Sequence, residues 1–137
     1  MHPKTIALQA RTQKFAADVI KFCDTLPQDT ATQRIVSQLV DSSGATDSNY
    51  RATCRARSKA EFIAKLGVAV EEADESKGWL ELLAASGRIS REPVQALIQE
   101  ADELISIFVK SRKTAEQRKA EHDRHEKQHR AALRRSR

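Results

Sequence analysis

Residues 49–62, with the sequence NYRATCRARSKAEF, decide the fold, because they predict the end of one helix, a tight turn and the start of the next. Ser58 and Glu61 have the S-x-x-E spacing of a capping box. In this motif the serine hydroxyl accepts the amide of the third helical residue, and the glutamate reaches back to the amide of the cap. The spacing therefore predicts that a new helix starts at Ser58.

Helical stripes extend in both directions from this turn. C-terminal to it, the predicted stripe has alternating steps of four and three residues and consists of Phe62, Leu66, Ala69, Ala73, Ser76, Leu80 and Leu83. The segment before the turn has the same spacing, at Ile35, Leu39, Ser42, Thr46, Asn49 and Thr53. Most of this second stripe is small or polar, which favours a close approach of the two helices. We expect a buried Asn49 to fix the register of the pair.

The helix-starting and helix-ending residues elsewhere in the chain predict four helices in all. The first runs from about Pro3 to Leu26 and is ended by Pro27. The second, with a weaker capping box at Thr30 and Gln33, runs to about Ala56. The third covers residues 59–86 and is ended by Gly87, and the fourth begins after Ser90 and is clear to about Arg112. Short connections predict an all-α, up-down-up-down antiparallel four-helix bundle over residues 1–112, followed by a basic, His-containing C-terminal extension over residues 113–137.

Composition agrees with a helical protein outside the membrane. Four glycines, three prolines and 4% aromatic residues argue against a β-sandwich or barrel. No apolar run reaches the ~20 residues of a membrane span, and no signal peptide is recognisable, so we expect a cytoplasmic protein. Cys23 and Cys54 lack Cys-x-x-Cys spacing and are expected to be reduced, packed thiols.

Positive charge is concentrated at the C-terminus. Residues 110–137 hold 11 Lys or Arg against 4 Asp or Glu, whereas residues 1–109 hold 13 against 15. This pattern predicts a globular scaffold with an arm that contacts phosphate. The candidate nucleic-acid-binding residues are Arg51 and Arg55 before the turn and, in the arm, Lys110, Arg112, Lys113, Arg118, Lys119, Arg124, Lys127, Arg130, Arg134, Arg135 and Arg137.

Some of these features have a plainer interpretation. Around the turn, Arg51, Arg55, Arg57 and Lys59 form a second basic group, for which ion pairing, as between Arg57 and Glu61, is favoured somewhat over phosphate contact. The aromatic residues Tyr50 and Trp79 are expected to pack rather than to stack on bases.

Catalytic and metal sites are not expected. His2 is the only histidine outside the arm, so a nucleophile lacks the usual base. The acidic residues of the third helix lack the Glu-x-x-His pattern of di-iron bundles and are interpreted as an acidic surface: Glu71, Glu72, Asp74 and Glu75. Three arm histidines, spaced for one helical face, are interpreted as part of a flexible, polar extension rather than as metal ligands: His122, His125 and His129. No cofactor is predicted.

Several of these residues resemble a known family. The pattern comprises Asn49, residues 58–63 (SKAEFI), Leu66, Ala69, Glu75, Leu80 and residues 87–90 (GRIS). It resembles, over roughly residues 4–112, the bacterial four-helix-bundle proteins often encoded in intervening sequences of large-subunit ribosomal RNA genes. A related branch includes the accessory variability protein of diversity-generating retroelements, which binds nucleic acid and works with a reverse transcriptase.

The resemblance implies a bundle that oligomerises as a pentamer. The family's common Ile-Ala-Glu-Gly after Asn49 is replaced here by residues 50–53 (YRAT). We expect a non-enzymatic, oligomeric, nucleic-acid-binding accessory factor for RNA or DNA, with a reverse transcriptase or another protein as a possible partner. The alternative is a protein-interaction scaffold whose basic arm serves as a solubilising extension. The arm is expected to be dispensable for folding and to carry much of the nucleic-acid affinity.

Overall fold

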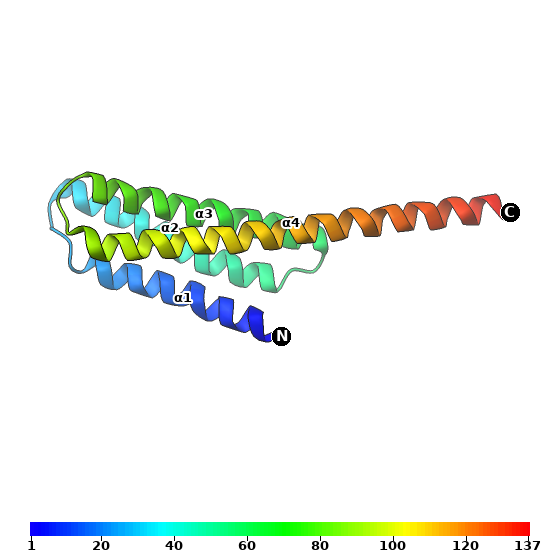
Figure 1. The fold of residues 1–137 in the computed structure, drawn as a ribbon, viewed down its shortest axis with the longest axis horizontal. Coiled ribbons are helices and arrows are strands. Elements are labelled where there is room, and N and C mark those ends of the chain that lie inside the picture. Colours follow the sequence, from blue (N-terminus) through cyan, green and yellow to red (C-terminus); the bar gives the residue numbers. More distant parts are fainter.

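The structure, a computed structural model, describes all 137 residues and contains four α-helices. They are α1 (Pro3–Cys23), α2 (Thr30–Cys54), α3 (Lys59–Ala85) and α4 (Arg91–Arg135). Each helix packs on its neighbours in the chain, and α1 also packs on α4, which closes an up-down-up-down antiparallel bundle (Figure 1). The predicted fold class is confirmed. None of the four helices combines the length and the apolar character that a membrane span requires.

The predicted stripes form the core. Every member of the α3 stripe is buried except Phe62, which is half-buried. Large side chains from the other helices complete the interior, chiefly Phe15, Val19, Leu39, Val94, Leu104 and Phe108. Periodic burial of this kind is what makes four weakly stable helices into one cooperative unit.

The seam between α2 and α3 is narrow and polar, as its small residues predict. Ser42 and Ser76 are both buried, and the Ser76 hydroxyl donates to the Ser42 hydroxyl across the two helices at 2.8 Å. Asn49 does not have the expected role: it is half-buried, and its amide donates to the Ala45 carbonyl of its own helix. A serine pair, rather than an asparagine, therefore makes the cross-helix hydrogen bond.

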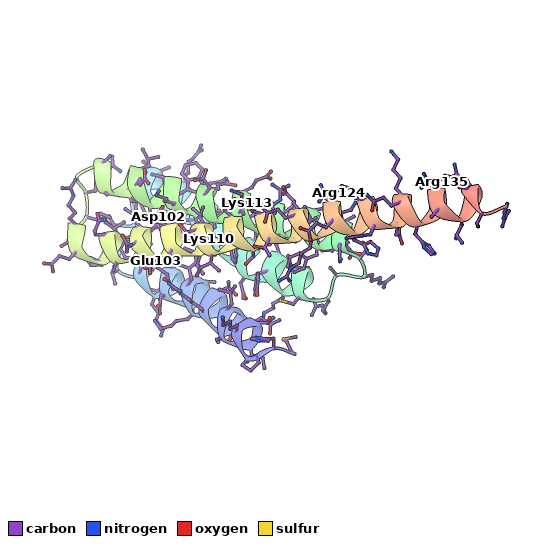
Figure 2. The ribbon with its side chains drawn as sticks, turned by 45° about the vertical axis from the view of Figure 1, so that its right-hand side comes forward. Asp102, Glu103, Lys110, Lys113, Arg124 and Arg135 are labelled. Atoms are coloured by element: carbon purple, nitrogen blue, oxygen red, sulfur yellow. The ribbon has the colours of Figure 1, made fainter.

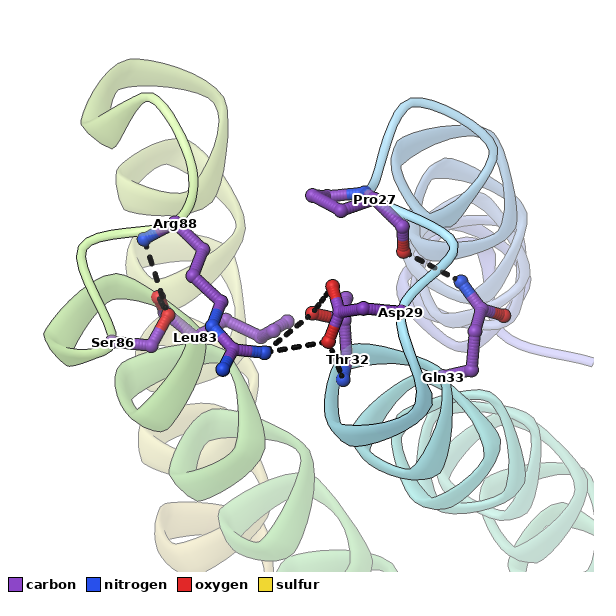
Figure 3. A network of polar contacts seen from close by, with 7 residues as sticks. All are labelled: Pro27, Asp29, Thr32, Gln33, Leu83, Ser86 and Arg88. Atoms are coloured by element: carbon purple, nitrogen blue, oxygen red, sulfur yellow. Dashed lines mark hydrogen bonds and ion pairs between the residues drawn. The ribbon is translucent and has the colours of Figure 1, made fainter.

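Two predicted boundaries at one end of the bundle are wrong. α1 ends at Cys23, before the predicted Leu26, because the chain tightens into a turn in which the Leu26 amide donates to the Cys23 carbonyl. α2 is capped by Asp29, not Thr30, since the Asp29 carboxylate accepts the Thr32 amide at 3.0 Å. Figure 3 shows that Asp29 also accepts from Arg88 of the α3–α4 turn, at 2.6 Å. Long-range pairing of this kind cannot be read from local sequence.

At the same end, Gly87 has a φ of 70° and ends α3 as predicted. α4 follows with Ser90 at its N-cap position, although the Ser90 side chain makes no capping hydrogen bond.

At the opposite end, the α2–α3 turn is built around Ser58. The Ser58 hydroxyl accepts the Glu61 amide at 3.1 Å, which confirms the predicted cap. The Glu61 carboxylate reaches back one residue further than in a capping box, to the amide of Arg57. α2 ends at Cys54 rather than Ala56, so Arg55 lies at the C-cap, just outside the helix.

α4 is much longer than predicted. It continues past Arg112 to Arg135, so the extension is an unbroken continuation of a helix and not an irregular segment. Figure 1 shows this part projecting from the bundle. The projecting part is shorter than the charged segment 110–137, and from here on the arm means residues 119–135 alone; all its side chains are exposed except Lys119, which is half-buried. Figure 1 also shows α1 inclined to the other helices, so its N-terminal end stands away from α4.

Candidate nucleic-acid interface

A groove lies where α4 leaves the bundle. It is bordered by the first residues of the chain, by the α2–α3 turn and by α4, and its volume is about 800 Å³. At this end of the bundle the N-terminal end of α1 stands away from α4 (Figure 1). The residues that line it are Met1, Thr5, Tyr50, Thr53, Cys54, Ala56, Arg57, Ser58, Lys59, Phe62, Lys110, Ser111, Thr114, Ala115 and Arg118.

Four cations line the groove, and no acidic residue does. They are Arg57 and Lys59 from the α2–α3 turn and the start of α3, with Lys110 and Arg118 from α4. None of the four has a carboxylate within 4.0 Å; the neighbouring acids Glu61, Glu116 and Asp123 pair instead with Lys65, Arg112 and Lys119. Four cations around a hollow that no acidic residue lines give a positive potential that attracts phosphate. Asp123, whose pKa is lowered by a hydrogen bond from Lys119 and also by the Lys59 charge, offsets this potential in part.

The floor of the groove is apolar. Tyr50 is 7% exposed, and its ring stacks on that of Phe108, with centroids 5.3 Å apart. Burial raises the pKa of the Tyr50 phenol far above its ordinary value, and a hydrogen bond with Cys54 adds to the shift. The phenol therefore stays neutral and does not offset the cations. Packing of Tyr50 in the bundle was predicted and is confirmed.

The structure separates the predicted binding residues into three sets. Lys110 and Arg118 are in the groove. Three others are engaged in ion pairs: Arg51 with Asp47, Arg112 with Glu116 and Lys119 with Asp123. Arg112 also donates from Nε to the Ile63 carbonyl, so it holds α4 against α3. The remaining cations are exposed and have no carboxylate within 4.0 Å: Arg55, Lys113, Arg124, Lys127, Arg130, Arg134, Arg135 and Arg137.

Figure 2 shows how these cations are distributed along α4. Asp102 and Glu103 lie on the first part of α4, Lys110 and Lys113 lie further along it but still beside the bundle, and Arg124 and Arg135 lie on the arm. The acids of the bundle part are partly neutralised within the fold, since Lys77 binds Asp102 at 3.0 Å and Arg11 binds Glu103 at 3.5 Å. The cations of α4 therefore begin on its last turns beside the bundle and continue along the arm.

Two groove residues are absent from the predicted binding set. The sequence favours ion pairing for Arg57 and Lys59, yet the Arg57 guanidinium has no pair with Glu61, and the Glu61 carboxylate accepts the Arg57 backbone amide instead. The sequence does hold a signal for this outcome, because Lys65 stands four residues after Glu61 in the same helix and competes with Arg57 for its carboxylate.

Other predicted features lie outside the groove or contribute no site. Glu71, Asp74 and Glu75 are exposed, and burial raises the pKa of half-buried Glu72, helped by repulsion from Glu75 and Glu71. Cys23 and Cys54 are free thiols, as expected, and burial raises the pKa of Cys23 to about 11. No group of three or more His, Cys, Asp or Glu side chains is placed to hold a metal ion.

Comparison with known proteins decides the family. Residues 4–110 match the family model of the 23S rRNA-intervening sequence protein. The chain belongs to this family. The match ends at residue 110, on the last turns of α4 that pack on the bundle, so the arm lies outside the residues that the family model matches.

A solved structure gives the same fold. It is the crystal structure of a protein with unknown function from the S23 ribosomal protein family of Bacteroides thetaiotaomicron, with 26% sequence identity and a TM-score of 0.74. The match covers 80% of this chain and 98% of that chain. Among proteins with curated descriptions, none matches.

Proposed function

We propose that this member of the 23S rRNA-intervening sequence protein family is a non-enzymatic accessory factor that binds nucleic acid through its groove and arm. The observation that carries the proposal is the convergence of Arg57, Lys59, Lys110 and Arg118 on one groove that no acidic residue lines. Folding has placed four like charges together from separate segments, an arrangement that costs free energy unless an anion neutralises it.

The arm extends this positive surface. Beyond Lys119 the chain carries six further Lys or Arg residues against three acids, all of them exposed. Cations at the helix surface can follow a phosphate backbone, and each contact releases condensed counterions, so affinity falls steeply with salt. Self-association, as a pentamer, and a reverse transcriptase as partner belong to the same proposal and rest on the resemblance of the bundle to the accessory variability proteins.

The test is the salt dependence of oligonucleotide binding. In one variant, the arm cations are neutralised by Arg124→Gln, Lys127→Gln and Arg130→Gln. In the matched control, Lys21→Gln, Arg34→Gln and Arg91→Gln neutralise three exposed, unpaired cations at the opposite end of the bundle. Fluorescence anisotropy across a salt series is expected to show a slope lower by about 2 to 3 for the arm variant, because each phosphate contact contributes roughly 0.7–0.9 to the slope. The control slope is expected to be unchanged.

A protein-interaction scaffold with a solubilising arm is the competing function. Its support is the exposed apolar surface outside the groove, including Ile20 at 52% and Leu82 at 48% exposure. Failure of the unmodified protein to bind any oligonucleotide at low salt would favour the scaffold, as would equal slopes for the two variants.

A further inference from the structure

Four planar side chains form a row that starts in the groove and continues along the arm. Arg118, His122, His125 and His129 are spaced by four, three and four residues, which places them on one face of α4. Arg118 lines the groove. The three histidines are exposed, since the arm has left the bundle. The row therefore continues the groove outward.

The spacing of the row suits the bases of a single strand. At a rise of 1.5 Å per residue, successive members are roughly 4.5 to 6 Å apart along the helix axis. Imidazole rings and guanidinium planes both stack on unpaired bases. His122 lies 3.3 Å from Glu126 through its Nε2 atom, an interaction at the ring edge that leaves the ring faces open.

The groove offers both an aromatic surface for a base and cations for its phosphate. Its half-buried Phe62 presents an aromatic surface beside the four cations, so a base can lie on the floor while its phosphate meets the rim. In a duplex the base faces are already stacked on one another, so neither the floor nor the row can use them. A positively charged groove followed by stacking side chains is the arrangement that binds single strands.

We propose that the groove and the Arg118–His129 row form one path for single-stranded nucleic acid, with phosphates held by the groove cations and bases stacked on the three imidazoles. This inference rests on the proposed function and narrows it, because general phosphate binding by the arm would not distinguish a single strand from a duplex.

The experiment compares full-length variants on an oligothymidylate of about 16 nucleotides and on a duplex of the same length. His122, His125 and His129 are changed together to alanine, or together to phenylalanine, which keeps a ring but cannot carry charge. The matched control is Gln117→Ala with Gln128→Ala, which removes exposed polar side chains from a different face of α4. Circular dichroism checks that every variant keeps its helices.

The alanine variant is expected to lose about tenfold to a hundredfold in single-strand affinity and to keep its duplex affinity, while phenylalanine restores single-strand binding. Equal losses on both probes, or no rescue by phenylalanine, would overturn the path and leave general phosphate binding in place. A loss in the glutamine control as large as in the alanine variant would overturn it too. An unmodified protein that binds neither probe would overturn the proposed function together with this inference.

Discussion

At the scale of single residues, the hydrogen bond between Ser42 and Ser76 marks how closely α2 and α3 approach. Both residues are at most 2% exposed. The Ser42 hydroxyl donates to the Leu39 carbonyl, and Ser76 Oγ lies within hydrogen-bond distance of both Ser42 Oγ and the Glu72 carbonyl. The pair is therefore satisfied without water, and its small volume is what the packing requires.

We expect Ser76→Leu to destabilise the bundle by about 1–3 kcal/mol or more, because a larger side chain must push the two helices apart. Ser76→Ala, which nearly keeps the volume and removes the hydroxyl, is expected to cost only about 1 kcal/mol. Urea denaturation followed by circular dichroism measures both. A leucine variant as stable as the alanine variant would show that the seam has room to spare.

Asp29 should make stability depend on pH. Hydrogen bonds from Thr32 lower the pKa of its carboxyl below the ordinary value, and the Arg88 guanidinium contributes to the shift. Because the pKa is lower in the folded state, the carboxylate stabilises the fold above the unfolded-state value of about 4, and the effect is lost as pH falls through the folded-state value.

Thermal unfolding of Asp29→Ala is therefore expected to show a lower Tm than the unmodified protein at neutral pH, with a difference that shrinks in acid. Asp41→Ala, on the exposed face of the same helix, serves as the control and should leave Tm unchanged or slightly raised. A constant difference at all pH values would mean that the carboxylate charge does not matter.

At the scale of elements, α4 combines a packed half with an arm stabilised only by local interactions. The arm has no Gly or Pro, is rich in strong helix formers and contains the i,i+4 pairs Lys119–Asp123 and His122–Glu126. The packed half supplies a nucleus from which the helix can propagate.

Truncation after Lys119 should remove helix without weakening the bundle. Among residues 120–137 only Leu133 is large and apolar, and it is 52% exposed, so the core keeps all of its side chains. The free energy of unfolding is expected to change by less than about 0.5 kcal/mol, while the helical signal falls in proportion to the residues removed. Urea titrations of both proteins provide the comparison, and a truncated chain that unfolds would show that the arm supports the bundle.

At the scale of the whole molecule, the apolar surface bears on self-association. Of the apolar residues that lie beside the core stripes, Val70, Trp79, Ile98 and Ile105 pack partly against the core, whereas Leu82 is 48% exposed and Ile63 is half-buried. The internal packing of the first four accounts for much of the extra apolar character without a partner. The exposed candidates on the helices of the bundle are then Ile6, Ile20, Val68, Leu82 and Val109.

Light scattering at micromolar concentration is expected to give a mass at least twice the 15.4 kDa of one chain. Leu82→Glu should shift the mass toward the monomer if this surface is an interface, because a charge buried between subunits is strongly unfavourable. Glu81→Gln, which changes an exposed neighbour without adding charge, is the control. A monomer mass for the unmodified protein would refute self-association.

The sequence by itself determined the four helices, the core stripes, the Ser58 and Gly87 helix ends and the concentration of charge in residues 110–137. These are local or periodic properties of the sequence. A periodic apolar stripe predicts which face of a helix is buried, whichever helix it packs against. The full length of α4 was missed because the apolar stripe stops at Phe108, although local helix propensity continues beyond it.

Only the tertiary structure decided which cations remain free and where they meet. Arg57 and Lys59 lie far from Lys110 and Arg118 in the sequence, and the antiparallel packing of α3 on α4 brings them to one groove. The Asp29–Arg88 pair has the same character, with its members 59 positions apart. Such pairings depend on how the whole chain folds, because they join residues that are far apart in the sequence. The residues next to each partner in the sequence do not indicate which distant residue it will meet.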